Sequence, residues 1–409
     1  MKILMFMRDP APPTRADVRV LFDKCLRAHG IATDFVAPPP RGASTEKVCT
    51  TRARLFISRA SSSRALELLR FAAHCCAVAW REGGRYDLVI ARDLPILAAP
   101  IFLLARWRGA HALAYWMSFP MPLGDRLLAR DHARAGRWPR AVVAWWRGAL
   151  AALLMRGAAL PLAHRVFVQS DAMRDAETRA GVPHSKLFAV PMGVDAQLVC
   201  TAPPDDTLPA HAPGPWIAYL GSLNLARRLD LLVEAMVLVL REFPTARLAL
   251  IGRADTPADA RWLAEYAQRR CPEGAIVFFD ARPMREAWRA IGAAALGVSP
   301  IPPGPLHDVS SPTKAVEYLA LGLPVVGNAI PDQRHVIERS GGGLVCAFTA
   351  EAFAEAICAL LRDPDGARAR GSLGRRWVLQ ERAYTTLAAQ LAPQLHALRR
   401  PSAQATDAA

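Results

Sequence analysis

The stretch that decides the fold reads ALGVSPIPPGPLHDVSSPTKAVEYLALG, residues 295–322. Its first six residues form a short apolar run that favours a buried strand, and a proline-rich loop then leads to a second apolar run of helical period. Ser310 or Ser311 is a suitable N-cap for this helix, and Pro312 suits its first position. The order of strand, loop and helix start predicts an α/β domain whose helix N-terminus can bind phosphate.

Two charges in this helix indicate what it faces. Lys314 falls in the first turn, where a cation opposes the helix dipole and is useful only if a dianion lies in front of it. Glu317 lies about one turn deeper on nearly the same face, where a carboxylate can accept hydrogen bonds from two ribose hydroxyls. The alternative is a buried helix that carries one solvated lysine and one solvated glutamate.

A second basic helix start lies upstream, in YLGSLNLARRLDLLVEAM, residues 219–236. Gly221 ends a predicted strand and lets the backbone approach a ligand, and Arg227 stands where an amphipathic helix begins. An arginine there can clamp a diphosphate with two parallel hydrogen bonds. Two basic helix starts in one domain indicate one anionic ligand, although an isolated Arg227 would more often be a surface residue.

The same alternation of apolar runs and helical segments extends along the whole chain. The expected strands are 2–7, 32–37, 54–58, 87–91, 112–117, 165–170, 187–191, 216–221, 247–252, 275–280, 295–300, 324–329 and 343–348, and the expected helices include 16–29, 229–242, 258–270, 284–292, 350–362 and 375–398. Strands that are buried on both faces and spaced by helices indicate parallel sheets. We therefore predict an α/β protein of two Rossmann-like, doubly wound domains that face a ligand cleft.

The domain boundaries follow from composition. Residues 196–215 are rich in Pro, Ala and Asp without any period, which is typical of a linker. The expected divisions are an N-terminal domain 1–197, a linker 198–214, a C-terminal domain 215–383, a C-terminal helix 384–399 that packs back on the N-terminal domain, and a disordered tail 400–409.

Charge is distributed unevenly along the 409 residues. The net charge is +15, of which residues 1–200 carry 29 − 15 = +14 and residues 201–409 carry 22 − 21 = +1. A basic first half indicates an anionic partner such as a membrane surface, a phosphorylated lipid or a nucleic acid. The alternative is a general preference for arginine, since only five of the 51 basic residues are lysines.

Several classes of protein are excluded by what the sequence lacks. Its eight cysteines form no CxxC pair, which argues against zinc sites and disulfides and favours a reducing compartment. No Walker A loop, HExxH helix or GxSxG turn occurs, which excludes P-loop NTPases, zincins and α/β-hydrolases. The single DxD, Asp363 to Asp365, follows a predicted helix and indicates a turn, so we expect neither a metal nor a cofactor. With no signal peptide and no apolar run of about 18 residues, we expect a cytoplasmic protein.

The second half resembles the retaining GT-B glycosyltransferases of family 4, also called glycosyl transferases group 1. YLGSLNLARRLDLLVEA is similar to their strand, loop and helix pattern, and SPTKAVEYLALGLPVV is similar to their donor-binding helix of the SPxK type. Residues 165–195 resemble the segment that closes the N-terminal domain of that family, whereas residues 1–160 agree mainly in architecture. The resemblance implies a bacterial hexosyltransferase that moves a sugar with retention from a UDP or GDP donor. Its acceptor would be a glycan or a polyprenyl-diphosphate-linked glycan, in cell-surface polysaccharide or glycolipid synthesis.

The resemblance also implies roles for single residues on the donor side. Glu317 would hold the ribose, Arg227 would take the place of a diphosphate-binding lysine, and Thr313 with Lys314 would face the phosphates. The remaining donor-side positions are Gly221, Ser222, Arg282, Met284 and Ser311. Two positions depart from the family: Val309 replaces the first acid of its E-x7-E motif, and Ser222 stands where arginine is common. His307 or Asp308 would then have to serve the donor sugar and the catalytic step.

In the first half, candidate residues follow the predicted strands. Asp93 comes after the run 87–91 and is a further catalytic candidate, and Arg15, Trp116 and Ser118 are expected on the acceptor side. Residues 100–108 and 138–157 mix Trp, Leu and Arg in the manner of an interfacial amphipathic helix. The alternative is that both are core helices. The first interpretation predicts a peripheral protein on the inner face of the cell membrane.

Two other functions compete with glycosyl transfer. A nucleotide-sugar epimerase of the same shape would share the ribose carboxylate but would need acid and base groups close to the sugar. A nucleic-acid-binding protein would explain the basic charge, but its aromatic residues should interleave with basic ones along a groove, and the sequence has no such pattern.

Overall fold

The computed structural model describes residues 1–13, 15–40, 53–200, 208 and 214–399, which fall into two compact units. The first unit comprises Met1–Pro191 together with Leu387–Ala409, and the second comprises Met192–Thr386. Most of the expected linker and the whole expected tail, 400–409, lie outside the described residues. Val199 and Leu208, which belong to the linker range, are buried in the core of the second unit.

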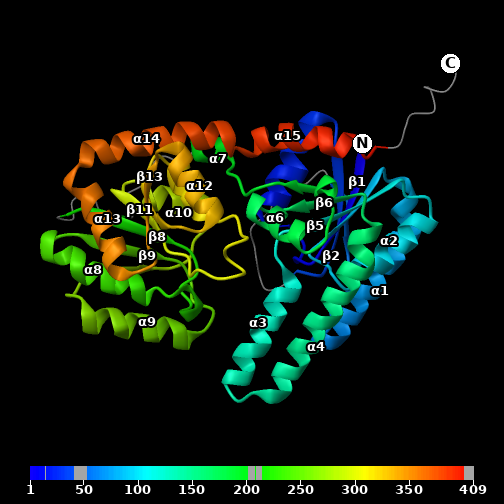
Figure 1. Cartoon of the computed structure of the whole chain (residues 1–409), viewed down its shortest axis with the longest axis horizontal. Helices are drawn as coiled ribbons and strands as arrows, with labels where there is room; N and C mark the ends of the chain where they lie inside the picture. Colours follow the sequence, from blue (N-terminus) through cyan, green and yellow to red (C-terminus); the bar gives the residue numbers. More distant parts are fainter. Residues whose placement is uncertain (14, 41–52, 201–207, 209–213, 400–409) are drawn as a thin grey trace. The chain divides into compact units, whose positions relative to one another are not determined.

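The first unit is built on a sheet of seven parallel strands (Figure 1). The strands, in their order across the sheet, are β3 (Leu55–Ile57), β2 (Ala32–Ala37), β1 (Lys2–Met7), β4 (Leu88–Arg92), β5 (Ala112–Met117), β6 (Arg165–Val168) and β7 (Leu187–Ala189). In register, Ile3 of β1 lies between Thr33 of β2 and Leu88 of β4.

The second unit repeats this topology with six parallel strands. They run in the order β10 (Ile276–Phe279), β9 (Arg247–Ile251), β8 (Trp216–Leu220), β11 (Leu296–Ser299), β12 (Val325–Asn328) and β13 (Gly343–Cys346). In both units the strand order reverses once, between β1 and β4 and between β8 and β11. Ligands of open α/β sheets bind at the carboxyl ends of the strands on either side of such a switch point.

Helices connect the strands of each unit. The first unit contains η1 (Asp17–Cys25), η2 (Leu26–His29), α1 (Arg64–Glu82), η3 (Gly83–Arg85), α2 (Ala98–Trp107), α3 (Met121–Arg134), α4 (Trp138–Leu154), η4 (Met155–Ala159), α5 (Leu160–Leu162), α6 (Asp171–Arg179) and η5 (His184–Lys186). The second contains α7 (Ala196–Cys200), η6 (Leu225–Arg227), α8 (Asp230–Glu242), α9 (Pro257–Arg270), α10 (Met284–Ile291), α11 (Thr313–Ala320), α12 (Pro331–Ser340), α13 (Ala350–Arg362) and α14 (Pro364–Glu381). The last helix, α15 (Tyr384–His396), begins in the second unit and continues in the first.

The stretch 375–398 is helical as expected but is divided between α14 and α15, and the C-terminal helix expected from residue 384 is α15. Val194 donates a backbone hydrogen bond to the carbonyl of Arg382, and Tyr384 donates one back to the carbonyl of Val194. These bonds form a short parallel bridge between Val194 and Ala383. A residue that pairs with a distant strand cannot also continue the helical ladder, so α14 ends at Glu381.

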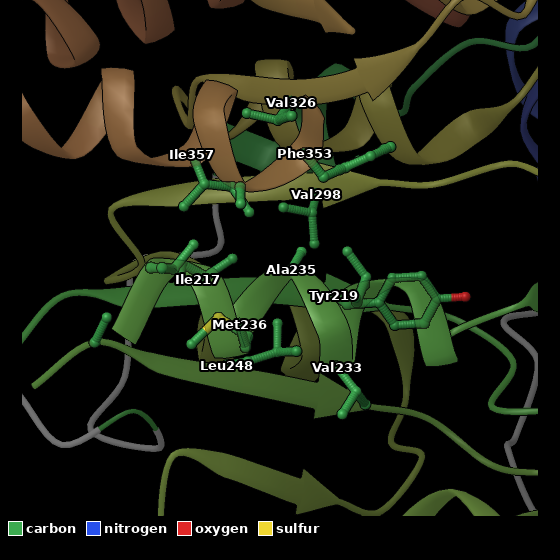
Figure 2. Close-up of a cluster of buried hydrophobic side chains, with 14 of the residues drawn as sticks. Ile217, Tyr219, Val233, Ala235, Met236, Leu248, Val298, Val326, Phe353 and Ile357 are labelled. Atoms are coloured by element: carbon green, nitrogen blue, oxygen red, sulfur yellow. The ribbon is translucent and has the colours of Figure 1, made fainter. Parts of the chain in front are cut away.

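The strands of the second unit bury both faces, as their continuous apolar runs predict. Figure 2 shows Ile217 and Tyr219 of β8 packed with residues of α8 and α13, such as Met236 and Phe353, on one face of the sheet. The residue between them on β8, Ala218, faces a second cluster that includes side chains of α10, α11 and α12. The sheet is therefore a buried middle layer whose strand ends and following loops remain available for function.

Helices α3 and α4 form a hairpin in the first unit (Figure 1). The two interfacial segments expected from the sequence have different outcomes. The segment 100–108 falls mostly in α2, where Ile101, Phe102 and Ala105 are buried. Leu103 and Trp107 of the same helix are exposed, so α2 has one face in the core and one apolar face outside it. In α4, which covers most of 138–157, the large apolar side chains are exposed, so the core-helix alternative is wrong there.

Candidate functional site

The loop after β11 leads into α11 one residue later than the sequence predicts. The helix begins at Thr313, and Pro312 is its N-cap in an extended conformation (φ −71°, ψ 133°) with no side chain capping the helix. Neither Ser310 nor Ser311 serves as the cap. The backbone N–H groups of the first turn therefore lack a side-chain partner of the usual kind, which leaves them available to an anion.

Ser311 has a different use. Its hydroxyl accepts a hydrogen bond from the Met192 backbone N–H (2.9 Å) and donates one to the Asp332 carboxylate (2.6 Å). The Arg382 guanidinium binds the same carboxylate at 2.6 Å and is itself buried. The Ser311 hydroxyl is thus committed to a buried network that fixes the start of α11, and a direct contact with the donor has no geometric support.

Lys314 lies against the end of β8. Its Nζ stands over the ring of Tyr219, 5.5 Å from the centroid. A Cβ atom added to Gly221 would lie 2.6 Å from Lys314 Cε, which is closer than real Cβ contacts allow. The end of the lysine side chain therefore lies directly against the backbone of Gly221, where a Cβ would force it to move, and the predicted glycine and lysine come together as one feature.

Three basic side chains meet in front of this helix start. Burial and the nearby Arg227 guanidinium lower the pKa of Lys314 to about 8, although Glu317 opposes the shift. Burial and Arg227 also lower the pKa of His307, with Lys314 adding a smaller effect. Among the described residues, neither Arg227 nor Lys314 lies within ion-pair distance of a carboxylate. Like charges held together without a counter-ion favour the binding of an anion.

Glu317 lies one turn further along α11 and is only 9% exposed. Burial raises the pKa of its carboxyl, and Lys314, Thr313 and Trp288 act in the opposite direction. The indole Nε1 of Trp288 is buried and, among the described residues, has no hydrogen-bond partner of good geometry. The indole N–H is thus close enough to favour the charged carboxylate but poorly aligned with it. Such a buried pair is an incomplete polar site, which a bound ligand can complete.

His307 and Asp308, the two catalytic candidates of this unit, occupy a closed turn. Asp308 accepts a hydrogen bond from the Gly304 backbone N–H at 3.1 Å, and the Ser310 hydroxyl donates to the His307 carbonyl at 2.7 Å. The carboxylate of Asp308 therefore stabilises its own loop, whereas the imidazole of His307 interacts with the basic cluster. Because its pKa is lowered, His307 is neutral at neutral pH; its one N–H is already directed at the Pro302 backbone carbonyl, and its other ring nitrogen can accept a hydrogen bond.

The other donor-side candidates contribute in different ways. The backbone carbonyl of Ser222 accepts a hydrogen bond from the Tyr219 hydroxyl (3.0 Å), which holds the loop after β8 in place. Arg282 is half-buried, and Met284, the first residue of α10, has an exposed side chain. Both follow β10, at the far edge of the sheet from β13.

The first unit holds a different cluster at its own switch point. Arg92, at the end of β4, is 1% exposed and pairs with Asp9, with Asp17 (2.8 Å) and more distantly with Asp93 (3.8 Å). Burial raises the pKa of Asp93, while Arg92 and Ser118 lower it. Asp93, the residue directly after β4, adopts a left-handed backbone (φ 52°).

Asp93 accepts hydrogen bonds from the Ser118 backbone N–H (2.8 Å), the Ser118 hydroxyl and the Phe119 backbone N–H (3.2 Å). The catalytic candidate Asp93 and the acceptor candidate Ser118 are thus partners of each other. Arg15 lies nearby, 3.5 Å from Asp17, with 44% of its side chain exposed.

The expectation that Trp116 belongs to the acceptor side is wrong. Its side chain is 4% exposed and packs between Phe22 and Phe167, with ring centroids at 4.9 and 5.2 Å. Both faces of β5 are covered, so position 116 points into the core whichever way the strand is turned.

Sequence reasoning missed Trp288, Tyr219 and Arg92. The first two look like ordinary core aromatics in the sequence, and nothing there signals their contact with Glu317 and Lys314. Arg92 left a signal, because a charged residue that ends the apolar run DLVIA needs a buried partner. No group of three or more His, Cys, Asp or Glu that could hold a metal ion occurs in the part of the chain that the structure describes.

Comparison with known proteins adds to this geometry. Residues 214–363 match the family model described as glycosyl transferases group 1. Sucrose-phosphate synthase from Thermosynechococcus elongatus superposes with a TM-score of 0.73 at 21% identity, covering 97% of this chain and 98% of that one. The fold is GT-B. HepE from Anabaena, solved in complex with UDP and with UDP-glucose, gives a TM-score of 0.70 at 17% identity over 97% of this chain and 100% of its own.

WaaG, described as a glycosyltransferase involved in lipopolysaccharide biosynthesis, gives a TM-score of 0.62 at 16% identity and covers 96% of this GT-B chain and 99% of its own. No curated protein matches the chain by sequence. At these identities the solved structures establish the fold alone. The fold and the family match over the second unit together support a glycosyltransferase of the GT-B type.

Proposed function

We propose that this protein is a retaining family 4 glycosyltransferase of the SPxK type that transfers a hexose from a nucleotide sugar, UDP or GDP linked, to a glycan or lipid-linked acceptor. The observation that carries the proposal is the pair of cations Arg227 and Lys314, which have no carboxylate within ion-pair distance among the described residues, in front of the uncapped start of α11. A leaving nucleoside diphosphate carries the negative charge that would balance these cations. HepE was solved with UDP and UDP-glucose, which makes the uridine donor the first to test.

The chemistry assigned to each residue follows from its surroundings. Free N–H groups of the first turn of α11, together with Arg227 and Lys314, would bind the diphosphate and stabilise the charge that develops as the glycosidic bond breaks. Glu317, with the indole N–H of Trp288 beside it, would take the ribose hydroxyls. Neutral His307, whose N–H meets the Pro302 carbonyl, would accept a hydrogen bond from a sugar hydroxyl through its other ring nitrogen. Arg227 and Lys314 can balance the negative charge of the leaving diphosphate without a metal ion, so we propose metal-independent transfer.

The acceptor side is proposed for the first unit. Arg15 is partly exposed beside the Arg92 cluster, and Ser118 is held by Asp93. An exposed arginine next to an ordered polar cluster suits a phosphorylated or otherwise anionic acceptor. Cys25, Cys75, Cys76, Cys271, Cys346 and Cys358 are free thiols. This supports our proposal that the reaction takes place in the reducing cytoplasm, in the synthesis of cell-surface polysaccharide or glycolipid.

The test uses the full chain and measures UDP and GDP binding by titration calorimetry. We expect a Glu317→Gln variant, which keeps the size but not the charge of the side chain, to bind roughly 10- to 100-fold more weakly, since hydrogen bonds to a charged group contribute about 1.5–3 kcal/mol. Glu338→Gln, an exposed glutamate that pairs with Arg334 in α12, is the matched control and should bind normally.

Release of free UDP from UDP-sugars, followed with and without added glycan acceptors, then separates transfer from epimerisation. Binding that is absent for every nucleotide, or unaffected by Glu317→Gln, contradicts the proposed function. A product whose sugar is altered without any acceptor present favours the epimerase instead.

A further inference from the structure

Helix α4 of the first unit has its small residues inside and its large residues outside. Its buried residues are Ala141, Ala144, Gly148 and Ala151. Its exposed large apolar residues, which are 46–68% accessible, are Trp138, Val142, Val143, Trp145, Trp146, Leu150 and Leu153. In a protein that meets only water, the larger apolar side chains of a helix face the core. This helix has the reverse arrangement.

The small residues let α4 approach α3 closely. A Cβ added to Gly148 would lie 3.0 Å from Asp125 Cβ and 3.2 Å from the Pro122 carbonyl oxygen. Across the same contact, the Arg147 guanidinium binds the Asp125 carboxylate through Nε at 3.0 Å. Close packing through small residues is the way helices associate when the surrounding medium is apolar. Helices α3 and α4 therefore pack against each other through their small residues, and the outer face of α4 takes no part in this packing.

That outer face is one continuous apolar surface. At 100° per residue, Trp138, Val142, Trp146, Leu150 and Leu153 fall on the side of α4 opposite the buried alanines. The rings of Trp145 and Trp146 contact each other edge to face with centroids 5.0 Å apart. Contiguous exposed apolar patches of this kind mark interaction sites. Tryptophan in particular is enriched where one side of a residue is apolar and the other is wet.

Arginines border the patch. Residues 121–154 carry six arginines and two aspartates, a balance of 6 − 2 = +4. Asp125 pairs with Arg147, and Asp131 lies 3.9 Å from Arg134. Within the described residues, the other four arginines of the hairpin, Arg126, Arg130, Arg137 and Arg140, have no carboxylate within ion-pair distance. Arg126 and Arg130 line one shallow groove together with Trp138, Trp145 and Trp146.

We propose that the α3–α4 hairpin docks on the surface of an anionic lipid bilayer, with the outer face of α4 at the level of the acyl boundary and its arginines on lipid phosphates. An apolar face bordered by unpaired cations is the complement of such a surface, and it lies in the plane of the membrane. A second copy of the chain would present the same positive charge, so self-association through this face is disfavoured.

Docking does not require crossing the membrane. Helix α4 has 17 residues and contains Arg147, and none of the described helices has the length and apolarity needed to span a bilayer. The inference also stands apart from glycosyl transfer, because it uses no residue of the donor site.

The test is co-sedimentation of the full chain with vesicles of phosphatidylcholine alone and of phosphatidylcholine mixed with phosphatidylglycerol in equal parts. We expect binding to the mixed vesicles, weakened by salt. The double variant Trp145→Gln/Trp146→Gln should bind roughly tenfold or more weakly, since it removes two insertion groups. Trp262→Gln is the matched control, since Trp262 is partly exposed on α9 of the second unit and stacks on Tyr266.

A second variant separates charge from insertion. Arg126→Gln/Arg130→Gln should weaken binding to the mixed vesicles by roughly fivefold per arginine and should not change binding to neutral vesicles. All four positions are exposed, so thermal unfolding and UDP titration should match the wild type and show that neither fold nor donor site has changed.

Three outcomes overturn the proposal. The first is a wild-type chain that sediments with neither vesicle. The second is a tryptophan double variant that binds as the wild type does. The third is a concentration-dependent dimer, seen by light scattering, that the tryptophan variant abolishes while vesicles have no effect, because a second copy would then cover the face.

Discussion

The two switch points have the same strand order and opposite electrostatics. In the first unit, Arg92 is enclosed by Asp9, Asp17 and Asp93, so a buried cation has more than enough negative charge within its own unit. In the second unit, Lys314 and Arg227 stand together with only Glu317, one turn away, to oppose them. The charges of the first cluster balance one another without a ligand, whereas the second cluster keeps an excess of positive charge.

The difference teaches that topology locates a site but does not determine which ligand binds there. Both sheets end in loops where ligands of α/β proteins bind. Whether a loop binds an anion depends on which charges the chain leaves uncompensated there. Each of the following experiments removes one charge and asks whether the loss appears in folding, as the first unit predicts, or in binding, as the second unit predicts.

The largest effect is expected for Arg92→Met. Removing the guanidinium leaves three carboxylates close together and partly or fully buried, which should cost about 3–5 kcal/mol of unfolding free energy. Urea unfolding, followed by circular dichroism, measures this loss. Arg85→Met is the control, because Arg85 pairs with Glu82 on the surface with 69% of its side chain exposed. A similar loss of unfolding free energy in both variants would show that the buried Arg92 cluster contributes no more to stability than a surface ion pair does.

The second prediction compares two neighbouring arginines. Arg227→Gln should weaken UDP binding roughly 10- to 100-fold, since a charge-assisted contact to phosphate contributes about 1.5–3 kcal/mol, with little change in stability. Arg228→Gln should bind as the wild type, because its guanidinium is already held by Asp230 at 3.0 Å. Calorimetry of both variants decides, and equal affinities would remove Arg227 from the diphosphate site.

A smaller effect of opposite sign is expected for Lys314→Met. Its lowered pKa means that the charged lysine is unfavourable in the free protein, so methionine should stabilise the unliganded chain by on the order of 1–2 kcal/mol and abolish most nucleotide binding. Between the folded value of about 8 and the ordinary value of 10.5, the unfolded chain holds a proton that the native one has lost. The stability of the wild type therefore rises with pH in that window, and the advantage of the variant shrinks.

The smallest effect concerns the pH dependence of binding. Because the pKa of Lys314 is about 8, the free protein loses this charge above that pH, and UDP binding must then restore the proton. Affinity should fall by up to about tenfold from pH 7 to pH 9. Titrations in buffers of different ionisation enthalpy at pH 8 should detect proton uptake, which the Lys314→Met variant should lack. A flat profile would mean that Lys314 does not meet the phosphate.

Much of the fold could be predicted from local sequence. Strands buried on both faces, such as LVIAR in β4 and LALI in β9, appear as continuous apolar runs, and each expected strand was confirmed with ends shifted by two residues at most. The start of α11 was missed because Ser311 bonds to Met192 and Asp332, which lie 119 and 21 residues away in the chain. Capping rules use neighbours and cannot anticipate such partners.

The site itself was partly predictable. Arg227, Lys314 and Glu317 could be singled out because charges at apolar helix starts are unusual, and the structure brings them together; that they bind a donor stays a prediction. Trp116 was misplaced because both faces of β5 are covered, so a side chain near the end of this strand is buried on either face. The sequence also left open which face of α4 packs against the rest of the unit. Its alanines and its tryptophans are all apolar, and only packing distinguishes them.

The path of the chain through its two units has a consequence for protein synthesis. Leu387, Leu391 and Leu395 of α15 are buried, and His396 lies 3.0 Å from the carbonyl of His29, so the last described helix belongs to the unit that is made first. On the ribosome, the second unit is complete before the first has received this helix. The N-terminal unit must therefore wait, with part of its apolar surface uncovered, until residues 387–396 have been synthesised. A chain that stops before Leu387 should leave its first unit prone to aggregation while its second unit folds.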